Sequence, residues 1–318
     1  MLDLAGLRRR VPRGAGPLAR LMGPGALLLG ATLLLVSQPI RALRAMPGDS
    51  VIRFHEEAGV RPGEMRVFLH RPPGWRPEDG RLLVVLHGAE RSGALMRDAW
   101  RRAADAYGAL VIAPEFSAQQ FPGPAWYNLG NVLDARGVIR PRDAWTFSVL
   151  DRAVEAVRAA TGAAAPRYTL YGFSAGAQFV HRYVLLTGAP GIDRAVAASA
   201  GWYTLPDPGL DFPCGLRGTG VEAGTVRGRL AFPLSIQVGQ RDTSPRDYFG
   251  SEGHEACADA QGSNRFARGR FFVEAGRRAA AQHDAPFAWR FVEALGVGHS
   301  EDGLADQAAG TLFALSTR

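Results

Sequence analysis

The chain has 318 residues, of which 47% are hydrophobic, and a formal charge of +7. This size and apolar content suit a globular chain with a sizeable core. Residues 1–45 hold seven arginines against one aspartate, so residues 46–318 are almost neutral. The charge therefore does not indicate a nucleic-acid-binding surface, and we expect no nucleic-acid partner.

The first 45 residues are predicted to be a targeting segment. An arginine-rich start leads into an apolar run at 21–36, which is shorter than the roughly 20 residues that span a bilayer comfortably. This pattern predicts a signal peptide or an N-terminal membrane anchor, and hence an exported, periplasmic or secreted protein. Any membrane contact is expected only through residues 21–36. Residues 46–318 are expected to form one domain.

Past this leader, short apolar runs alternate with longer amphipathic runs. This alternation is typical of a parallel sheet wrapped by helices. In chain order, the predicted strands are 65–70, 81–86, 110–113, 168–171, 195–200, 234–238 and 288–294. The predicted helices are 95–107, 144–160, 177–186, 265–282 and 304–316. Two long loops, 115–142 and the Gly- and Pro-rich insertion 203–233, lie between these elements.

One Gly-x-Ser-x-Gly pattern carries the first chemical signal. Gly172-Phe-Ser-Ala-Gly176 directly follows the predicted strand 168–171 and directly precedes a predicted helix. In this setting the pattern predicts a nucleophile elbow, in which Ser174 is lifted above the sheet edge. Gly172 and Gly176 are expected because strand and helix pass too closely to leave room for a Cβ atom.

A serine hydroxyl needs a histidine base, and four histidines follow Ser174. His299 comes after the last predicted strand, at the sheet edge where an imidazole reaches the elbow, so we predict it as the base. His181 lies two turns along the same helix, His254 lies in a hydrophilic loop, and His283 is expected to cap a helix C-terminus.

The acid that orients the histidine is expected between the serine and the histidine in the chain. Asp242 follows the predicted strand 234–238 after a glycine, which places it at the carboxyl end of a strand. Asp247 is the alternative acid, and the alternative role for Asp242 is to start a turn.

An oxyanion hole is predicted in the loop after strand 81–86, which begins His87-Gly88. We assign one backbone N–H to Ala89, with Gly88 and Glu90 as alternatives, and the second to Ala175. His87 is interpreted as a structural support of this loop, with Gly88 as a further structural glycine.

Together, the His87-Gly88 loop, the Ser174 elbow, Gly239-Gln-Arg-Asp242 and Gly296-Val-Gly-His299 resemble the α/β-hydrolase superfamily. Within it, the chain is similar to the polyhydroxybutyrate-depolymerase-like and feruloyl-esterase-like branch over about residues 62–317. The resemblance implies an α/β-hydrolase fold, a mostly parallel central sheet with helices on both faces. It also places an aromatic substrate loop at Ala125-Trp-Tyr-Asn128. The depolymerases carry a cysteine at the position of Ala89.

The expected function is hydrolysis of a small ester or a polyester by Ser174, His299 and Asp242 through an acyl-enzyme. An amidase or peptidase, or a non-catalytic binding protein on the same fold, is the alternative. Predicted substrate contacts are at Trp126, Tyr127, Glu115 and Trp202.

No cofactor is expected, because no dinucleotide or phosphate-loop glycine pattern appears. The histidines and cysteines lack the spacing of a metal site. Cys214 and Cys257 are a possible disulfide in an oxidising compartment and two inert thiols in the cytosol, and the prediction of export favours the bond.

Overall fold

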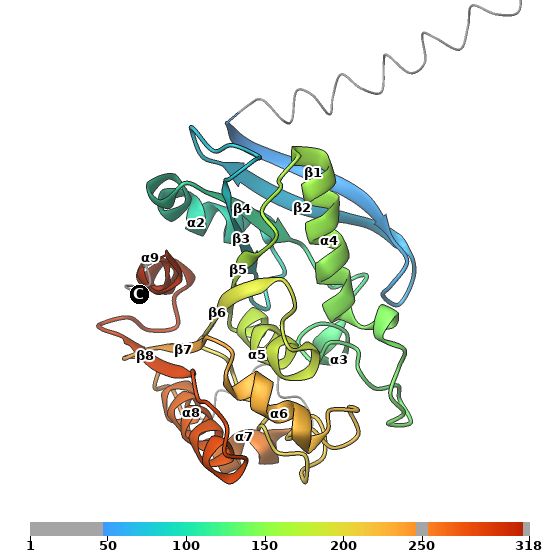
Figure 1. Ribbon diagram of the computed structural model, residues 1–318, viewed down its shortest axis with the longest axis vertical. Helices are drawn as coiled ribbons and strands as arrows, with labels where there is room; N and C mark the ends of the chain where they lie inside the picture. The colour runs from blue at the N-terminus through green and yellow to red at the C-terminus, as the bar shows by residue number, and fades with distance from the viewer. Residues whose placement is uncertain (1–46, 246–253, 314–318) are drawn as a thin grey trace, which may run out of the picture. The chain divides into compact units, whose positions relative to one another are not determined.

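The computed structural model describes residues 47–245 and 254–313 (Figure 1). The strands are β1 (Gly48–Glu56), β2 (Gly63–Arg71), β3 (Arg81–Leu86), β4 (Ala109–Pro114), β5 (Tyr168–Phe173), β6 (Ile192–Ala198), β7 (Leu234–Gly239) and β8 (Arg290–Ala294). The helices are α2 (Gly93–Tyr107), α3 (Gly123–Trp126), η1 (Arg142–Ala144), α4 (Thr146–Thr161), α5 (Ala175–Thr187), α6 (Ala223–Leu230), α7 (Glu255–Gln261), α8 (Arg265–Gln282) and α9 (Glu301–Phe313).

The strands form one eight-stranded sheet in the order β1-β2-β4-β3-β5-β6-β7-β8. The β1–β2 and β2–β4 pairs are antiparallel, and all other neighbours are parallel. Parallel strands need both faces covered, which explains the continuous apolar run of β3. The sheet order therefore brings the carboxyl ends of β3, β5, β7 and β8 to one edge, where ligands bind in such folds.

Successive residues of each strand pack against opposite faces of the sheet. On one face, Leu83 and Val85 of β3 pack with Trp100 of α2 and with Leu304 of α9. The other face is covered by α4, α5 and α8, and it holds the larger part of the core (Figure 1). Helices thus cover both faces of the sheet, which confirms the predicted α/β-hydrolase fold.

Local signals in the sequence set the ends of the α2 helix. The Ser92 side chain accepts a hydrogen bond from the Leu95 amide at the N-terminus, 3.2 Å away. At the C-terminus, Gly108 has a φ of 63°, a left-handed conformation that favours glycine. The Ser92 cap thus marks where the loop that begins at His87 ends and α2 begins.

Several elements differ from the sequence prediction. The edge strand β1 and the short helices α3, α6 and α7 were not expected, and α9 begins at Glu301, three residues before the predicted start. The predicted leader 1–45, with its apolar run 21–36, and the alternative acid Asp247 lie outside the described residues. Within the two described ranges, no helix has the length and apolar character needed to cross a membrane.

Candidate active site

Ser174 occupies the sharp turn between β5 and α5. Its φ of 54° and ψ of −109° form a strained conformation that is rare for a residue with a side chain. A Cβ atom on Gly172 would collide with the Gly176 carbonyl, and one on Gly176 would collide with the Leu86 carbonyl. Both glycines are therefore required by the close passage of strand and helix. The nearest atoms to a Cβ on Gly88 would be side-chain atoms, of the exposed Glu90 at 2.6 Å and of the Phe173 ring at 3.3 Å, so the backbone contact that requires the other two glycines is not among them.

The three residues predicted as a triad lie together, in hydrogen-bonding order. His299 Nε2 lies 3.2 Å from Ser174 Oγ, and His299 Nδ1 lies 2.8 Å from Asp242 Oδ2. Because the Asp242 carboxylate is an acceptor only, Nδ1 carries the proton and Nε2 is left to accept from the serine hydroxyl. The imidazole is thus in the tautomer that a general base needs.

Asp242 is 3% exposed, so its charge needs compensation. Burial by itself raises the pKa of Asp242, but the hydrogen bond with His299 and the charges of His299 and Arg265 outweigh it. The pKa is held below its ordinary value. Arg265, the first residue of α8, lies 3.3 Å from the other carboxylate oxygen and is itself 4% exposed. Asp242 is therefore ionised when His299 works.

The ring of Phe173 packs against the His299 ring. The two ring centroids are 4.7 Å apart, and Phe173 directly precedes Ser174 in β5. Neither Phe173 nor Arg265 was found from the sequence. Phe173 stands at the variable position of the Gly-x-Ser pattern, where its type carries no signal, and Arg265 is 23 residues from its partner.

The His87-Gly88 loop lies beside the elbow, as predicted. Burial lowers the pKa of His87 to about 3, so the ring is neutral. Its Nδ1–H donates to the Gly88 carbonyl at 3.0 Å, and its Nε2 accepts from the Phe116 amide at 3.0 Å. His87 thus holds the loop and carries no proton in the reaction, in agreement with the prediction. In the described part of the chain, no loop or turn hydrogen bond to a backbone carbonyl involves the amide of Ala175 or of Gly88, Ala89 or Glu90. All four are therefore candidates for an oxyanion hole, and the choice of Ala89 over its two neighbours stays a prediction.

Three of the four predicted substrate contacts are buried inside the protein. Tyr127 and Trp202 are 0% exposed and Glu115 is 9% exposed. Tyr127 donates its hydroxyl to the His87 carbonyl at 2.8 Å, Trp202 lies under a buried arginine, and Glu115 forms an ion pair with Arg66. These contacts give the three residues supporting roles, and their contact with a substrate stays a prediction. Trp126 is half-buried, below the guanidinium of Arg140 at 5.5 Å from the ring centroid.

Arg182 joins the loops around α5. It is 0% exposed and donates to Thr204 Oγ1 at 2.8 Å, to the Asn128 carbonyl at 3.1 Å and to Gln178 Oε1 at 3.1 Å. Burial lowers its pKa to about 9, and its guanidinium lies 4.4 Å from the centroid of the Trp202 ring. It thereby ties the 115–142 loop and the start of the 203–233 insertion to the helix that begins at the nucleophile.

The other three histidines after Ser174 have structural contacts: His283 caps α8 as predicted, whereas His254, expected in a hydrophilic loop, starts the unexpected helix α7. His181 Nδ1–H donates to the Ala177 carbonyl and its Nε2 accepts from the Thr204 amide, both at 3.0 Å. His283 occupies the C-cap of α8, and His254 the N-cap of α7. No other histidine of the described ranges is hydrogen-bonded to Ser174.

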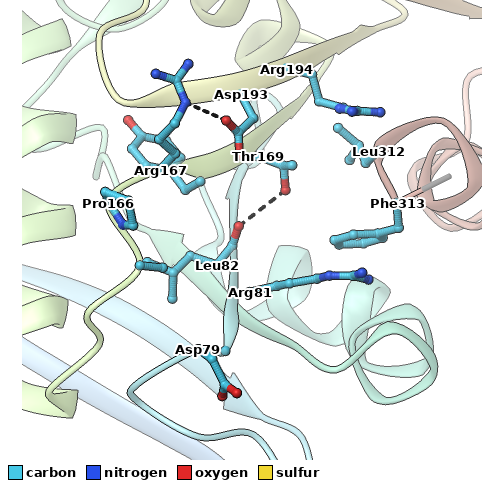
Figure 2. A pocket seen from close by; sticks show the side chains of 13 residues that line it. Asp79, Arg81, Leu82, Pro166, Arg167, Thr169, Asp193, Arg194, Leu312 and Phe313 are labelled. Atoms are coloured by element: carbon cyan, nitrogen blue, oxygen red, sulfur yellow. Dashed lines mark hydrogen bonds and ion pairs between the residues drawn. The ribbon is translucent and has the colours of Figure 1, made fainter. Parts of the chain in front are cut away.

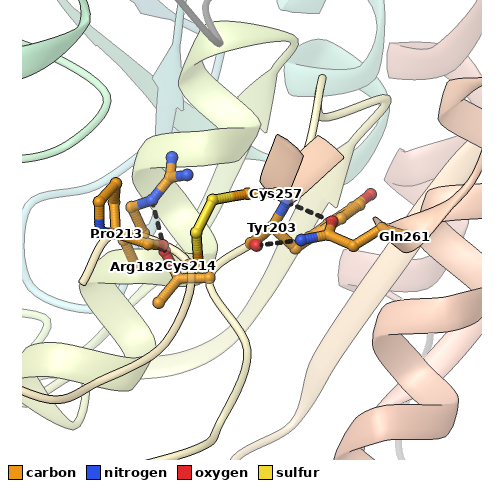
Figure 3. The surroundings of a disulfide bond; sticks show 7 residues. Arg182, Tyr203, Pro213, Cys214, Cys257 and Gln261 are labelled. Carbon is orange, nitrogen blue, oxygen red and sulfur yellow. Dashed lines mark hydrogen bonds between the residues drawn. A yellow bond between two sulfur atoms is a disulfide. The ribbon is translucent and has the colours of Figure 1, made fainter. Parts of the chain in front are cut away.

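A disulfide joins Cys214 of the insertion to Cys257 of α7 (Figure 3). Next to it, the Gln261 side chain accepts from the Tyr203 amide at 2.9 Å and donates to the Tyr203 carbonyl at 2.7 Å. The insertion is therefore attached covalently and by hydrogen bonds to the helix that follows the Asp242 loop. No group of three His, Cys, Asp or Glu side chains in the described ranges is arranged to hold a metal ion.

A cavity of about 530 Å³ lies at the opposite edge of the sheet, by the amino ends of β3, β5 and β6 (Figure 2). Arg167, paired with Asp193, and Phe313 of α9 are part of its wall (Figure 2). It contains no member of the triad. The cavity therefore does not belong to the Ser174 site.

The strained serine between β5 and α5, the histidine after β8 and the acid after β7 are the arrangement of an α/β-hydrolase. Neither a family model nor a curated protein sequence matches the chain. Solved structures do. Poly(aspartic acid) hydrolase-1 from Sphingomonas sp. KT-1 is 38% identical, with a TM-score of 0.78, over 84% of this chain and 98% of that one.

Two further solved structures are similar to this chain. A poly(3-hydroxybutyrate) depolymerase from Bordetella parapertussis is 35% identical, with a TM-score of 0.80, over 86% of this chain and 92% of that one. An S-formylglutathione hydrolase from Agrobacterium tumefaciens shares the fold at 16% identity, with a TM-score of 0.53, over 83% of this chain and 92% of that one. The chain belongs to the polyhydroxybutyrate-depolymerase-like branch of the α/β-hydrolase superfamily, and it is a hydrolase.

Proposed function

We propose that this hydrolase cleaves carboxylic esters with Ser174 as nucleophile. The observation that carries the proposal is the chain of two hydrogen bonds from Ser174 Oγ through His299 to the buried Asp242. His299 Nε2 takes the hydroxyl proton while Oγ attacks the ester carbonyl carbon. The C–O bond to the alcohol then breaks, and the alcohol leaves with the proton from His299.

The resulting acyl-enzyme is hydrolysed by the same residues. A water molecule gives a proton to His299 and attacks the acyl carbon, and the proton returns to Ser174 as the acid leaves. In both steps the Ala89 and Ala175 amides would stabilise the negative oxygen of the tetrahedral intermediate. A single such donor is worth about 3 kcal/mol.

The substrate is proposed to be a small ester or a polyester, because one relative is named a poly(3-hydroxybutyrate) depolymerase. An amide substrate is the second candidate, because the relative at 38% identity is named a poly(aspartic acid) hydrolase and poly(aspartic acid) is a polyamide. A non-catalytic role is disfavoured by the complete hydrogen-bonded triad.

Two measurements test the proposal. Incubation with a fluorophosphonate should add the phosphonyl group to the peptide that contains Ser174, and Ser174→Ala should remain unlabelled. A panel of p-nitrophenyl esters, the matched p-nitroanilides, poly(3-hydroxybutyrate) films and dissolved poly(aspartic acid) then separates ester from amide hydrolysis. Folded protein with no adduct and no turnover on any of these would refute the proposal.

We further propose that the protein is exported, as residues 1–45 predict. The disulfide supports this proposal, because such bonds persist in oxidising compartments. Fractionation of expressing cells, with N-terminal sequencing of the mature chain, tests it. Full-length chain in the cytosol alone would argue against export.

A further inference from the structure

The loop that carries the Ala89 amide has two side-chain anchors, one at each end. At its start, His87 binds the Phe116 amide through its ring, and its carbonyl accepts from the Tyr127 hydroxyl at 2.8 Å. At its other end lies Arg91. Between them, Ala89 is half-buried and Glu90 is exposed, and the backbone bond that closes the turn, from the Arg91 amide to the Gly88 carbonyl, is long at 3.4 Å.

Arg91 has an unusual backbone and an unusual set of contacts. Its φ is 57°, in the left-handed region that residues with side chains seldom adopt. Its guanidinium donates to three carbonyls of the segment that follows β4, those of Phe116 at 2.9 Å, Phe121 at 3.0 Å and Gly123 at 3.1 Å. It also lies 4.2 Å from the centroid of the Tyr127 ring.

Tyr127 therefore contacts both anchors, since its hydroxyl holds His87 and its ring faces Arg91. A strained residue persists only where its surroundings determine its conformation, and such residues cluster at functional sites. Here the three carbonyls and the tyrosine ring hold Arg91 in its left-handed conformation. Their common effect is to fix the turn that presents the Ala89 N–H.

We propose that Arg91 is a positioning residue for the oxyanion hole, holding the Ala89 amide at the place where the negative oxygen forms. This inference rests on the proposed ester hydrolysis at Ser174. Arginine suits the role because its planar fork reaches several carbonyls at once, whereas a lysine ammonium is a single point on a flexible stem. An oxyanion donor must be placed before the reaction, because it stabilises the transition state and not the bound substrate.

The test compares Arg91→Met, Arg91→Lys and a control, Arg152→Met. Arg152 is also a half-buried arginine with backbone and side-chain partners, Asp143 and Glu56, but it joins α4 to β1 and contacts no residue of the site. Steady-state kinetics on p-nitrophenyl butyrate are measured for each variant, together with the rate of fluorophosphonate labelling and the melting temperature.

We expect Arg91→Met to lower kcat by about 10- to 100-fold with KM nearly unchanged, because one oxyanion donor is displaced and not removed. The labelling rate should fall by a similar factor. The kcat of Arg91→Lys should lie between those of Arg91→Met and the wild type. Arg152→Met should melt at a lower temperature and keep its kcat.

Two results would overturn the inference while leaving ester hydrolysis in place. One is an unchanged kcat in Arg91→Met. The other is a kcat loss in Arg152→Met as large as that in Arg91→Met, which would make the effect one of stability. A wild-type protein with neither turnover nor a Ser174 adduct would instead refute the proposed function, and this inference with it.

Discussion

The disulfide between Cys214 and Cys257 should stabilise the domain by an amount that follows from its span. The two cysteines are 43 residues apart, and closing a loop of that length in the unfolded chain removes about 13 cal/mol/K of entropy. This corresponds to about 4 kcal/mol at 25 °C. We expect Cys214→Ala with Cys257→Ala to lose this amount in the free energy of unfolding, which for a chain of this size is roughly 8 °C in melting temperature.

Urea unfolding followed by circular dichroism, with refolding curves that overlay, measures the loss. Cys257 is buried, so alanine also removes packing there. Wild-type protein unfolded with and without a reducing agent isolates the effect of the bond, and should show the same difference of about 4 kcal/mol. A difference below about 1 kcal/mol would show that the unfolded chain already holds these segments together, and the loop-closure reasoning would be wrong.

Three further predictions concern Asp242, Gly176 and the first residue of α9, Glu301. Asp242→Asn offers one carbonyl oxygen to two donors, His299 Nδ1–H and Arg265, and should lower kcat about 10³- to 10⁴-fold in the ester assay with the fold retained by circular dichroism. Gly176→Ala places a Cβ against the Leu86 carbonyl, and should cost at least about 10-fold in the Ser174 labelling rate as well as thermal stability. Burial, with the charges of Glu90 and Asp302, raises the pKa of the Glu301 side chain to about 7. The folded protein then keeps a proton that the unfolded chain releases near pH 4.5, so stability falls as pH rises through this window. Glu301→Gln should therefore match the wild type in melting temperature below pH 4.5 and exceed it above pH 7, and equal melting temperatures at pH 8 would contradict the raised pKa.

The elements that could be predicted most accurately from the sequence are those whose pattern of apolar residues is uninterrupted. β3 and α8 were predicted with their observed bounds, because the first is buried on both faces and the second is a long periodic helix. β1 was missed because it is an edge strand whose residues are half-buried or exposed, except for Ile52 and Glu56, which are buried. A strand of that kind has neither a continuous apolar run nor a strict alternation.

The predicted triad residues are brought together for a related reason. Ser174, Asp242 and His299 each follow the end of a parallel strand, and parallel strands deliver their carboxyl ends to one edge of the sheet. A residue's place in the chain is then enough to place it in space. Aromatic type gives no such placement: Tyr127 and Trp202 were predicted to contact substrate because they are aromatic, and the structure buries both side chains.

The residues that hold the site share a feature that explains why sequence patterns miss them. Arg91 and Arg182 donate mostly to backbone carbonyls and amide oxygens, on segments from 4 to 54 positions away in the chain. Every residue has a carbonyl, so the partner's identity leaves no trace in the sequence. Arg265 does have a carboxylate partner, Asp242, but 23 positions separate the two and no pattern links them. In this chain, the catalytic residues can be predicted because they are Ser, Asp and His at the ends of strands. The arginines that hold the surrounding loops in place can be identified only from the folded backbone.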